Sequence, residues 1–108
     1  MKLPQNTTIA RRKVTDYLLR HREEDDKSGF LARAGYSMEK PDRLIDDIRK
    51  QLLPLNAELM EETEYGPKYR ICGTLTGPNG RVFRVSSIWM KEDATGDTKF
   101  VTLFPEKS

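Results

Sequence analysis

The sequence contains few of the residues on which catalytic and metal sites usually depend. Its 108 residues include 1 cysteine, Cys72, and 1 histidine, His21. A single cysteine excludes an internal disulfide and a cysteine-rich zinc site, and a single histidine excludes a two-histidine metal motif. A phosphate-binding glycine loop, a dinucleotide-binding glycine pattern and an EF-hand loop are missing as well. We therefore expect the protein to use no metal and no cofactor.

Long apolar runs and a strong charge of one sign are also missing. No uncharged apolar stretch approaches the roughly 20 residues of a membrane-spanning helix, and the segment 1–8 lacks the apolar core of a secretion signal. The 19 basic and 17 acidic side chains give a net charge of +2, too small to indicate nucleic acid or membrane binding by itself. With 36% hydrophobic residues, the composition is typical of a folded domain. We expect one cytoplasmic domain over residues 1–108, with no membrane partner.

The first half of the sequence has helical spacing. Residues 1–56 carry 12 Lys or Arg and 9 Asp or Glu. The clearest helix begins at Pro41, which is well suited to a first helical position, and its apolar residues recur every three or four positions, at Leu44, Ile45, Ile48 and Leu52. We predict helices over 10–20 and 41–53, and between them a short helical turn around 30–34 that Gly35 ends.

Beyond Asn56 the apolar residues alternate with polar ones, as they do in strands. We predict four strands, over 57–63, 68–76, 81–91 and 98–104, separated by segments rich in Gly, Pro, Asn and Asp. This order predicts an α+β fold. The N-terminal helices (1–56) pack on one face of a four-stranded antiparallel meander (57–105). The other face is then solvated or used for binding, and function is sought there.

Several residues of the predicted strands are candidate contacts for a substrate. The cations Arg70, Arg84, Lys91 and Lys99 lie together if the strands form a meander, and they could hold phosphates. The alternative is that they are ordinary solvated side chains. Trp89 is either a platform on which a base stacks or a core residue beside Phe83 and Val85. For Cys72 we expect a packed or half-buried side chain and not a catalytic thiol, because no histidine is near it in the sequence.

His21 is the candidate for proton transfer. It follows the predicted first helix, lies between Arg20 and Arg22 and precedes Lys27. Histidine gains and loses protons near neutral pH, and neighbouring cations can bind a phosphodiester. The alternative is a histidine that stabilises the C-terminal end of a helix. The acidic run over 23–26 lacks the spacing of a calcium loop and is expected to be a solvated loop.

A set of short segments resembles a known family. They are Lys13-Val14-Thr15-Asp16-Tyr17-Leu18-Leu19, Phe30 with Gly35-Tyr36, Tyr65-Gly66-Pro67-Lys68-Tyr69, Gly77-Pro78-Asn79-Gly80-Arg81, Val85-Ser86-Ser87-Ile88-Trp89 and Phe100-Val101-Thr102-Leu103-Phe104-Pro105. In their order and spacing they resemble the domain-of-unknown-function family 6883 over nearly the whole chain. Members of this family occur as small bacterial proteins and as C-terminal modules of polymorphic toxins.

The resemblance implies a function related to toxins. The order of helices and strands is similar to that of ribonuclease toxins of the barnase, colicin and RelE kind, which implies RNA binding or metal-independent RNA cleavage. On this basis His21 is the proton carrier, Lys27 and Lys99 contact phosphate, and Ser87 or Thr102 orients polar groups. The alternative is a non-catalytic interaction module, either the partner of a small adjacent protein or a vestigial toxin domain. The expected partner is thus RNA or a small protein. No residue argues specifically for a third possibility, a small ligand bound between helices and sheet.

Overall fold

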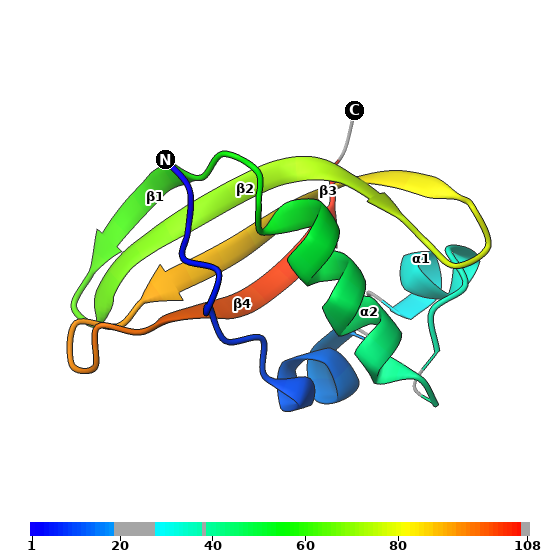
Figure 1. The fold of residues 1–108 in the computed structure, drawn as a ribbon, viewed down its shortest axis with the longest axis horizontal. Helices are drawn as coiled ribbons and strands as arrows, with labels where there is room; N and C mark the ends of the chain where they lie inside the picture. The colour runs from blue at the N-terminus through cyan, green and yellow to red at the C-terminus, as the bar shows by residue number, and fades with distance from the viewer. Residues whose placement is uncertain (19–27, 38, 107–108) are drawn as a thin grey trace.

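The computed structural model describes residues 1–18, 28–37 and 39–106. Its largest element is an antiparallel sheet of four strands: β1 (Glu58–Thr63), β2 (Gly66–Thr76), β3 (Val82–Lys91) and β4 (Thr98–Pro105). The strand order is β1-β2-β3-β4, so each strand pairs with the next one along the chain (Figure 1). This order confirms the predicted four-stranded meander. The strands could be predicted because alternation of apolar and polar residues is a strong signal for half-buried strands.

The described helical segments are few and short. They are η1 (Lys13–Leu18), α1 (Ser28–Arg33), α2 (Pro41–Asp47) and η2 (Ile48–Leu52), where η marks the wider π-helical winding. α2 begins at Pro41, as predicted, and continues directly into η2. Gly35 follows α1 with φ 97°, a left-handed conformation that favours glycine and ends the helix. No helix among the described residues is long and apolar enough to cross a membrane.

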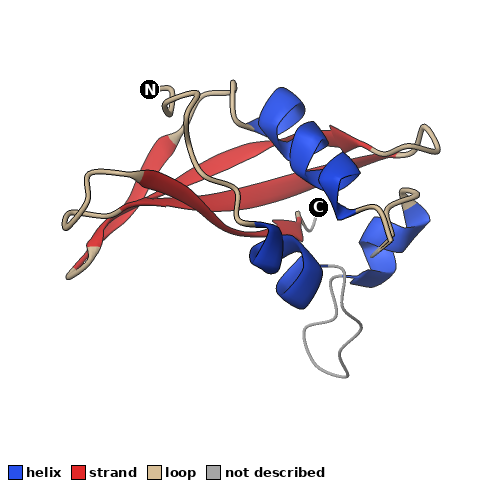
Figure 2. Cartoon of the chain, turned by 60° about the horizontal axis from the view of Figure 1, so that its bottom comes forward, coloured by secondary structure: helices blue, strands red, loops and turns tan. Residues whose placement is uncertain are grey.

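The hydrophobic core combines side chains from helices and strands. Trp89 and Phe100 are buried, with ring centroids 5.1 Å apart and planes at 73°, an edge-to-face contact. The same core cluster includes Leu44, Ile48 and Leu52 from the helical segment and Ile71, Leu75 and Val85 from β2 and β3. η2 approaches β2 closely, since a Cβ atom on Gly73 would lie 3.3 Å from Leu52 Cδ2. Figures 1 and 2 show the α2–η2 segment crossing the sheet.

The N-terminal segment contacts the strands at two places. The N-terminal amine of Met1 donates to the carbonyl of Ala57 (3.3 Å), and the amide of Ala57 donates to the carbonyl of Met1 (2.6 Å). Further along, the amide of Thr8 donates to the carbonyl of Thr98 (2.9 Å), and the amide of Phe100 donates to the carbonyl of Thr8 (2.8 Å). The segment therefore extends the pairing beyond the four strands, beside the start of β1 and along the edge of β4.

A β-bulge in β4 decides which residues lie on which face. Trp89 pairs with Phe100, but Ile88 pairs with Thr102, so Val101 is an extra residue in β4. Because of this shift, Thr102 lies on the same face as Ile88. The face opposite the Trp89 side chain, here called the outer face, carries Arg70, Cys72, Thr74, Arg84, Ser86, Ile88 and Thr102.

Candidate functional site

The alternation of β2 and β3 places two arginines on the outer face. Arg70 lies opposite Ile88, and Arg84 lies opposite Thr74. The side chains of Arg70 and Arg84 are 44% and 74% exposed, respectively. Both guanidinium groups can therefore be reached by a ligand from solvent.

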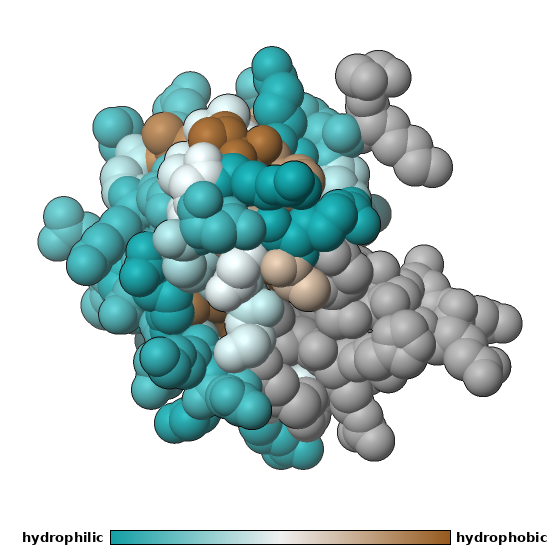
Figure 3. All heavy atoms as spheres, turned by 90° about the vertical axis from the view of Figure 1, so that its right-hand side faces the viewer, coloured by the Kyte–Doolittle hydropathy of each residue, from teal (hydrophilic) through white to brown (hydrophobic). Residues whose placement is uncertain are grey.

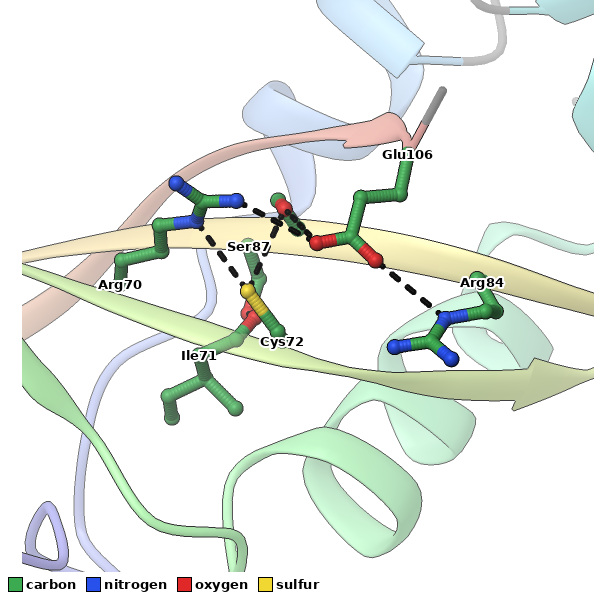
Figure 4. A network of polar contacts seen from close by, with 7 residues as sticks. Arg70, Ile71, Cys72, Arg84, Ser87 and Glu106 are labelled. Carbon is green, nitrogen blue, oxygen red and sulfur yellow. Dashed lines mark hydrogen bonds and ion pairs between the residues drawn. The ribbon is translucent and has the colours of Figure 1, made fainter. Parts of the chain in front are cut away.

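Glu106 joins the two arginines. Just beyond β4, its amide donates to the carbonyl of Arg84 (2.9 Å), which continues the pairing of β3 and β4 by one step. Its Oε1 lies 3.3 Å from an Nη of Arg70, and its Oε2 lies 3.3 Å from Nε of Arg84. Figure 4 shows the two arginines approaching the carboxylate from opposite sides. The Glu106 side chain remains 25% exposed.

Cys72 and Ser86 complete this group. Arg70 Nε donates to Cys72 Sγ (3.1 Å), Cys72 Sγ lies 3.5 Å from Ser86 Oγ, and Ser86 Oγ donates to Glu106 Oε1 (3.4 Å). The thiol of Cys72 and the two guanidinium groups hold the pKa of Glu106 below its ordinary value. Contacts with Cys72 and Glu106 raise the pKa of Arg70. We call these five residues, Arg70, Cys72, Arg84, Ser86 and Glu106, the outer-face cluster.

The chemistry of the outer-face cluster suits an anionic ligand that carries a hydroxyl. Exposed ion pairs are weak in water, so the guanidinium groups can exchange the carboxylate for another anion. Their planar arrangement of donors matches the oxygens of a phosphate. An ionised carboxylate beside them can accept a proton from a hydroxyl within hydrogen-bond reach. Among residues 1–18, 28–37 and 39–106, no group of three or more His, Cys, Asp or Glu could hold a metal ion.

A cavity of about 330 Å³ opens beside the outer-face cluster. It is lined by Leu55, Asn56, Glu58, Arg70 and Cys72. Its lining thus combines the guanidinium and thiol of the cluster with the segment that leads into β1. A ligand held by Arg70 has room to extend in this direction.

The structure brings some of the predicted site residues to this face. Arg70 and Arg84 belong to the cluster, and Thr102 lies in the same row as Arg70, because both pair with Ile88. Lys99 is further along β4, where its Nζ forms an ion pair with Glu92 Oε1 at 2.5 Å. The two remaining candidates from the loop, His21 and Lys27, lie outside the described residues, so their roles stay predictions.

Ser87 and Trp89 lie on the core side of β3 and are buried. Trp89 Nε1 donates to Ser87 Oγ (2.8 Å), and Ser87 Oγ donates to the carbonyl of Ile71 (3.0 Å). Their polar groups are thus used inside the protein, and a ligand on the surface does not reach them. Burial favours the interpretation of Trp89 as a core residue, and we include neither residue in the proposed site.

Sequence reasoning missed Glu106 and misjudged Cys72. For Cys72 the expectation of a packed or half-buried side chain is wrong, since Cys72 is exposed. Its Sγ lies between Arg70 and Ser86 (Figure 4). Glu106 lies beyond the predicted fourth strand (98–104), so the alternation along that strand does not assign it to a face. The signal that could have found it is the strand register: once the bulge at Val101 is counted, residue 106 falls opposite Arg84.

The comparisons with known proteins agree with this fold. A chain in the solved "Contact-dependent growth inhibition toxin - immunity protein complex from Klebsiella pneumoniae 342" is similar, with a TM-score of 0.60 and 14% sequence identity. The match covers 95% of this chain and 96% of that chain. At this identity the likeness concerns the fold. No curated protein is similar in sequence to the chain. The family described as Domain of unknown function (DUF6883) matches residues 2–107, and the chain belongs to this family.

Proposed function

We propose that this chain is a toxin-type domain that binds RNA through the outer-face cluster and cleaves it without a metal ion. The observation that carries the proposal is the ionised Glu106 carboxylate between the exposed guanidinium groups of Arg70 and Arg84. In the proposed arrangement the helices of residues 1–56 cover the opposite face, so the outer face remains for the substrate. We place the action in the cytoplasm, where RNA is found.

In the proposed reaction a phosphodiester binds between Arg70 and Arg84. Glu106 accepts the proton of the ribose 2′-hydroxyl, and the 2′-oxygen attacks the neighbouring phosphorus. The bond from phosphorus to the 5′-oxygen breaks, and a 2′,3′-cyclic phosphate forms. His21, the proton carrier predicted from the sequence, gives a proton to the leaving 5′-oxygen. The two guanidinium groups stabilise the negative charge that develops on the phosphoryl oxygens.

Two further observations support the proposal. The fold likeness to a chain in a toxin–immunity protein complex is consistent with a toxin-related or immunity-like domain. The cavity beside Arg70 gives the neighbouring nucleotide a place to lie next to the cluster.

The test is incubation of the purified protein with total RNA in the presence of a chelator. The variants are Glu106→Gln and Arg84→Gln, with Glu64→Gln and Arg81→Gln as matched controls, since both control residues are exposed and lie outside the cluster. We expect Glu106→Gln to slow cleavage by about a hundredfold or more and Arg84→Gln by about tenfold or more. His21→Ala tests the proton donor in the same assay. A wild-type protein that leaves RNA intact, or a Glu106→Gln variant as fast as wild type, would overturn the proposal.

A second candidate function is a non-catalytic interaction module with a small protein partner. The specific observation in its favour is the exposed first strand, β1, which ends the sheet on one side. In this case the wild-type protein neither binds nor cleaves RNA, and Glu106→Gln and Arg84→Gln behave like their controls.

A further inference from the structure

β1 is an edge strand with little protection. It is the first in the strand order, and within the described part of the chain no strand pairs with its other side. Five of its six residues are exposed, and the sixth, Thr63, is partly so. Alternate amide and carbonyl groups of an edge strand point away from the sheet, and they are able to pair with another strand.

The structure shows strand-type pairing at the beginning of this edge. Met1 and Ala57 exchange two main-chain hydrogen bonds, the pattern of a hydrogen-bonded antiparallel pair. Ala57 immediately precedes β1, so this pairing lies next to the start of Glu58–Thr63. A strand that lies beside β1 would extend this pairing without moving the sheet.

The side chains along this edge define what kind of strand fits. The segment 58–64 carries four carboxylates, Glu58, Glu61, Glu62 and Glu64, all exposed. Between them, Leu59 and Met60 expose 56% and 52% of their surface, a large fraction for apolar side chains of a strand. Glu61 forms an ion pair with Lys68 of the neighbouring strand β2, with 3.8 Å between Oε1 and Nζ. An acidic edge with exposed apolar residues favours a partner strand that is basic and partly apolar.

We propose that β1 docks a β-strand of a partner protein, and that this strand alternates lysine or arginine with apolar residues. Main-chain hydrogen bonds along β1 give the affinity, and the glutamates select basic side chains. The inference is independent of RNA cleavage, because its surface is the free edge of the sheet and not the outer-face cluster.

A second copy of this chain is a poor occupant of the same edge. Two β1 strands placed side by side would bring glutamates opposite glutamates, and like charges directly opposite each other destabilise a strand pair. At the other end of the molecule, around α1 and the turn between β2 and β3, the surface is mostly hydrophilic with a small apolar area (Figure 3). Because two copies would repel each other along this edge, the acidic edge of β1 points to a partner of opposite charge.

The test is an NMR titration of the chain without an N-terminal tag, since a tag would begin beside Ala57. The probe is a peptide of about seven residues, enough to span β1, that alternates lysine and valine and has blocked ends. The control peptide has glutamate in place of lysine. We expect saturable binding of the lysine peptide with a Kd below about 1 mM. The amide shifts that change should be those of residues 57–63, and the amides on the open side should exchange more slowly with solvent.

Charge variants separate docking on β1 from general attraction. Glu62→Lys should weaken binding of the lysine peptide by about fivefold, whereas Asp46→Lys, the same charge change on an exposed position of α2, should leave it unchanged. No binding of the lysine peptide below about 1 mM, equal binding of the glutamate peptide, or shifts confined to other residues would overturn the proposal. Concentration-dependent dimer formation through β1 would overturn the assignment of a basic partner.

Discussion

The hydroxyl of Tyr36 donates a hydrogen bond of 2.6 Å to the carboxylate of Asp47. Both residues are buried. Arg43 Nε contacts the same carboxylate oxygen at 3.2 Å, and the Tyr36 hydroxyl also lies 3.3 Å from the carbonyl of Thr76. The pair therefore joins the segment after α1, the end of α2 and the end of β2, and it compensates a buried charge.

Replacing Tyr36 with phenylalanine should destabilise the fold. The change removes the donor while the Asp47 carboxylate stays buried, and such a loss costs about 1–3 kcal/mol. Urea unfolding measures the free energy of unfolding. The matched control is Tyr65→Phe, whose side chain lies at an exposed turn, and we expect it to change stability by less than about 0.5 kcal/mol. Equal stability of the two variants would contradict this role of Tyr36.

The same pair predicts a loss of stability in alkali. Burial first, and then the hydrogen bond to Asp47, raises the pKa of Tyr36 above its ordinary value of 10.0. Above that pH the unfolded chain has lost this proton and the folded chain keeps it. The contribution of Tyr36 to stability is therefore complete below pH 10 and is lost as the pH rises towards the folded pKa.

The measurement is urea unfolding of wild type and Tyr36→Phe on both sides of this pH. The difference in unfolding free energy between them should shrink above about pH 10, by at most about 1.4 kcal/mol per pH unit. Lysines titrate in the same range, but they are common to both proteins and cancel in the difference. A difference that stays constant with pH would show that Tyr36 does not titrate as we describe.

Ser87→Ala should affect stability and leave any activity of the folded protein intact. The variant removes the acceptor of Trp89 Nε1 and the donor to the carbonyl of Ile71, so two buried polar groups lose a partner. We expect a loss of about 1–3 kcal/mol and a change in tryptophan fluorescence. RNA cleavage per folded molecule should stay at the wild-type rate. A large fall in that rate at unchanged stability would return Ser87 to the catalytic group.

Two glycines in and beside β2 should respond differently to alanine. At Gly77 a Cβ atom would collide with the main-chain carbonyl of Ala34, which cannot move independently of the segment after α1. At Gly73 the collision is with the Cδ1 methyl of Leu55, the end of a flexible side chain. We expect Gly77→Ala to cost about 1–3 kcal/mol and Gly73→Ala to stay within about 1 kcal/mol of wild type. Thermal or urea unfolding of both variants measures the two losses of unfolding free energy. Equal losses for Gly77→Ala and Gly73→Ala would contradict this account.

The sequence predicted the sheet well because the local pattern is strong. Alternation of apolar and polar residues in β2 and β3 assigns Arg70 and Arg84 to one face and Ile71 and Val85 to the other. The same alternation places Ser87 with Trp89 on the apolar side. The resemblance to a family, and not the alternation, led to a catalytic role for Ser87.

The full candidate site could not be predicted from local patterns. Without the bulge at Val101, the register of the β3–β4 hairpin would place residue 106 opposite Phe83, on the core side. The extra residue moves Glu106 by one position to Arg84 and to the outer face. A bulge depends on packing between strands, and no residue type in 98–105 marks its position.

The most direct test of the central claim is an NMR titration with an RNA dinucleotide in which a hydrogen replaces the 2′-hydroxyl, so that it binds without being cleaved. The signals to follow are the Nε–H groups of Arg70 and Arg84 and the side-chain carboxyl carbon of Glu106. If the outer-face cluster holds the phosphodiester, all three signals shift and saturate together, and the Nε–H of Arg81 does not move. If the nucleotide shifts the signals of other residues and leaves the signals of Arg70, Arg84 and Glu106 unchanged, the outer face is not the RNA site.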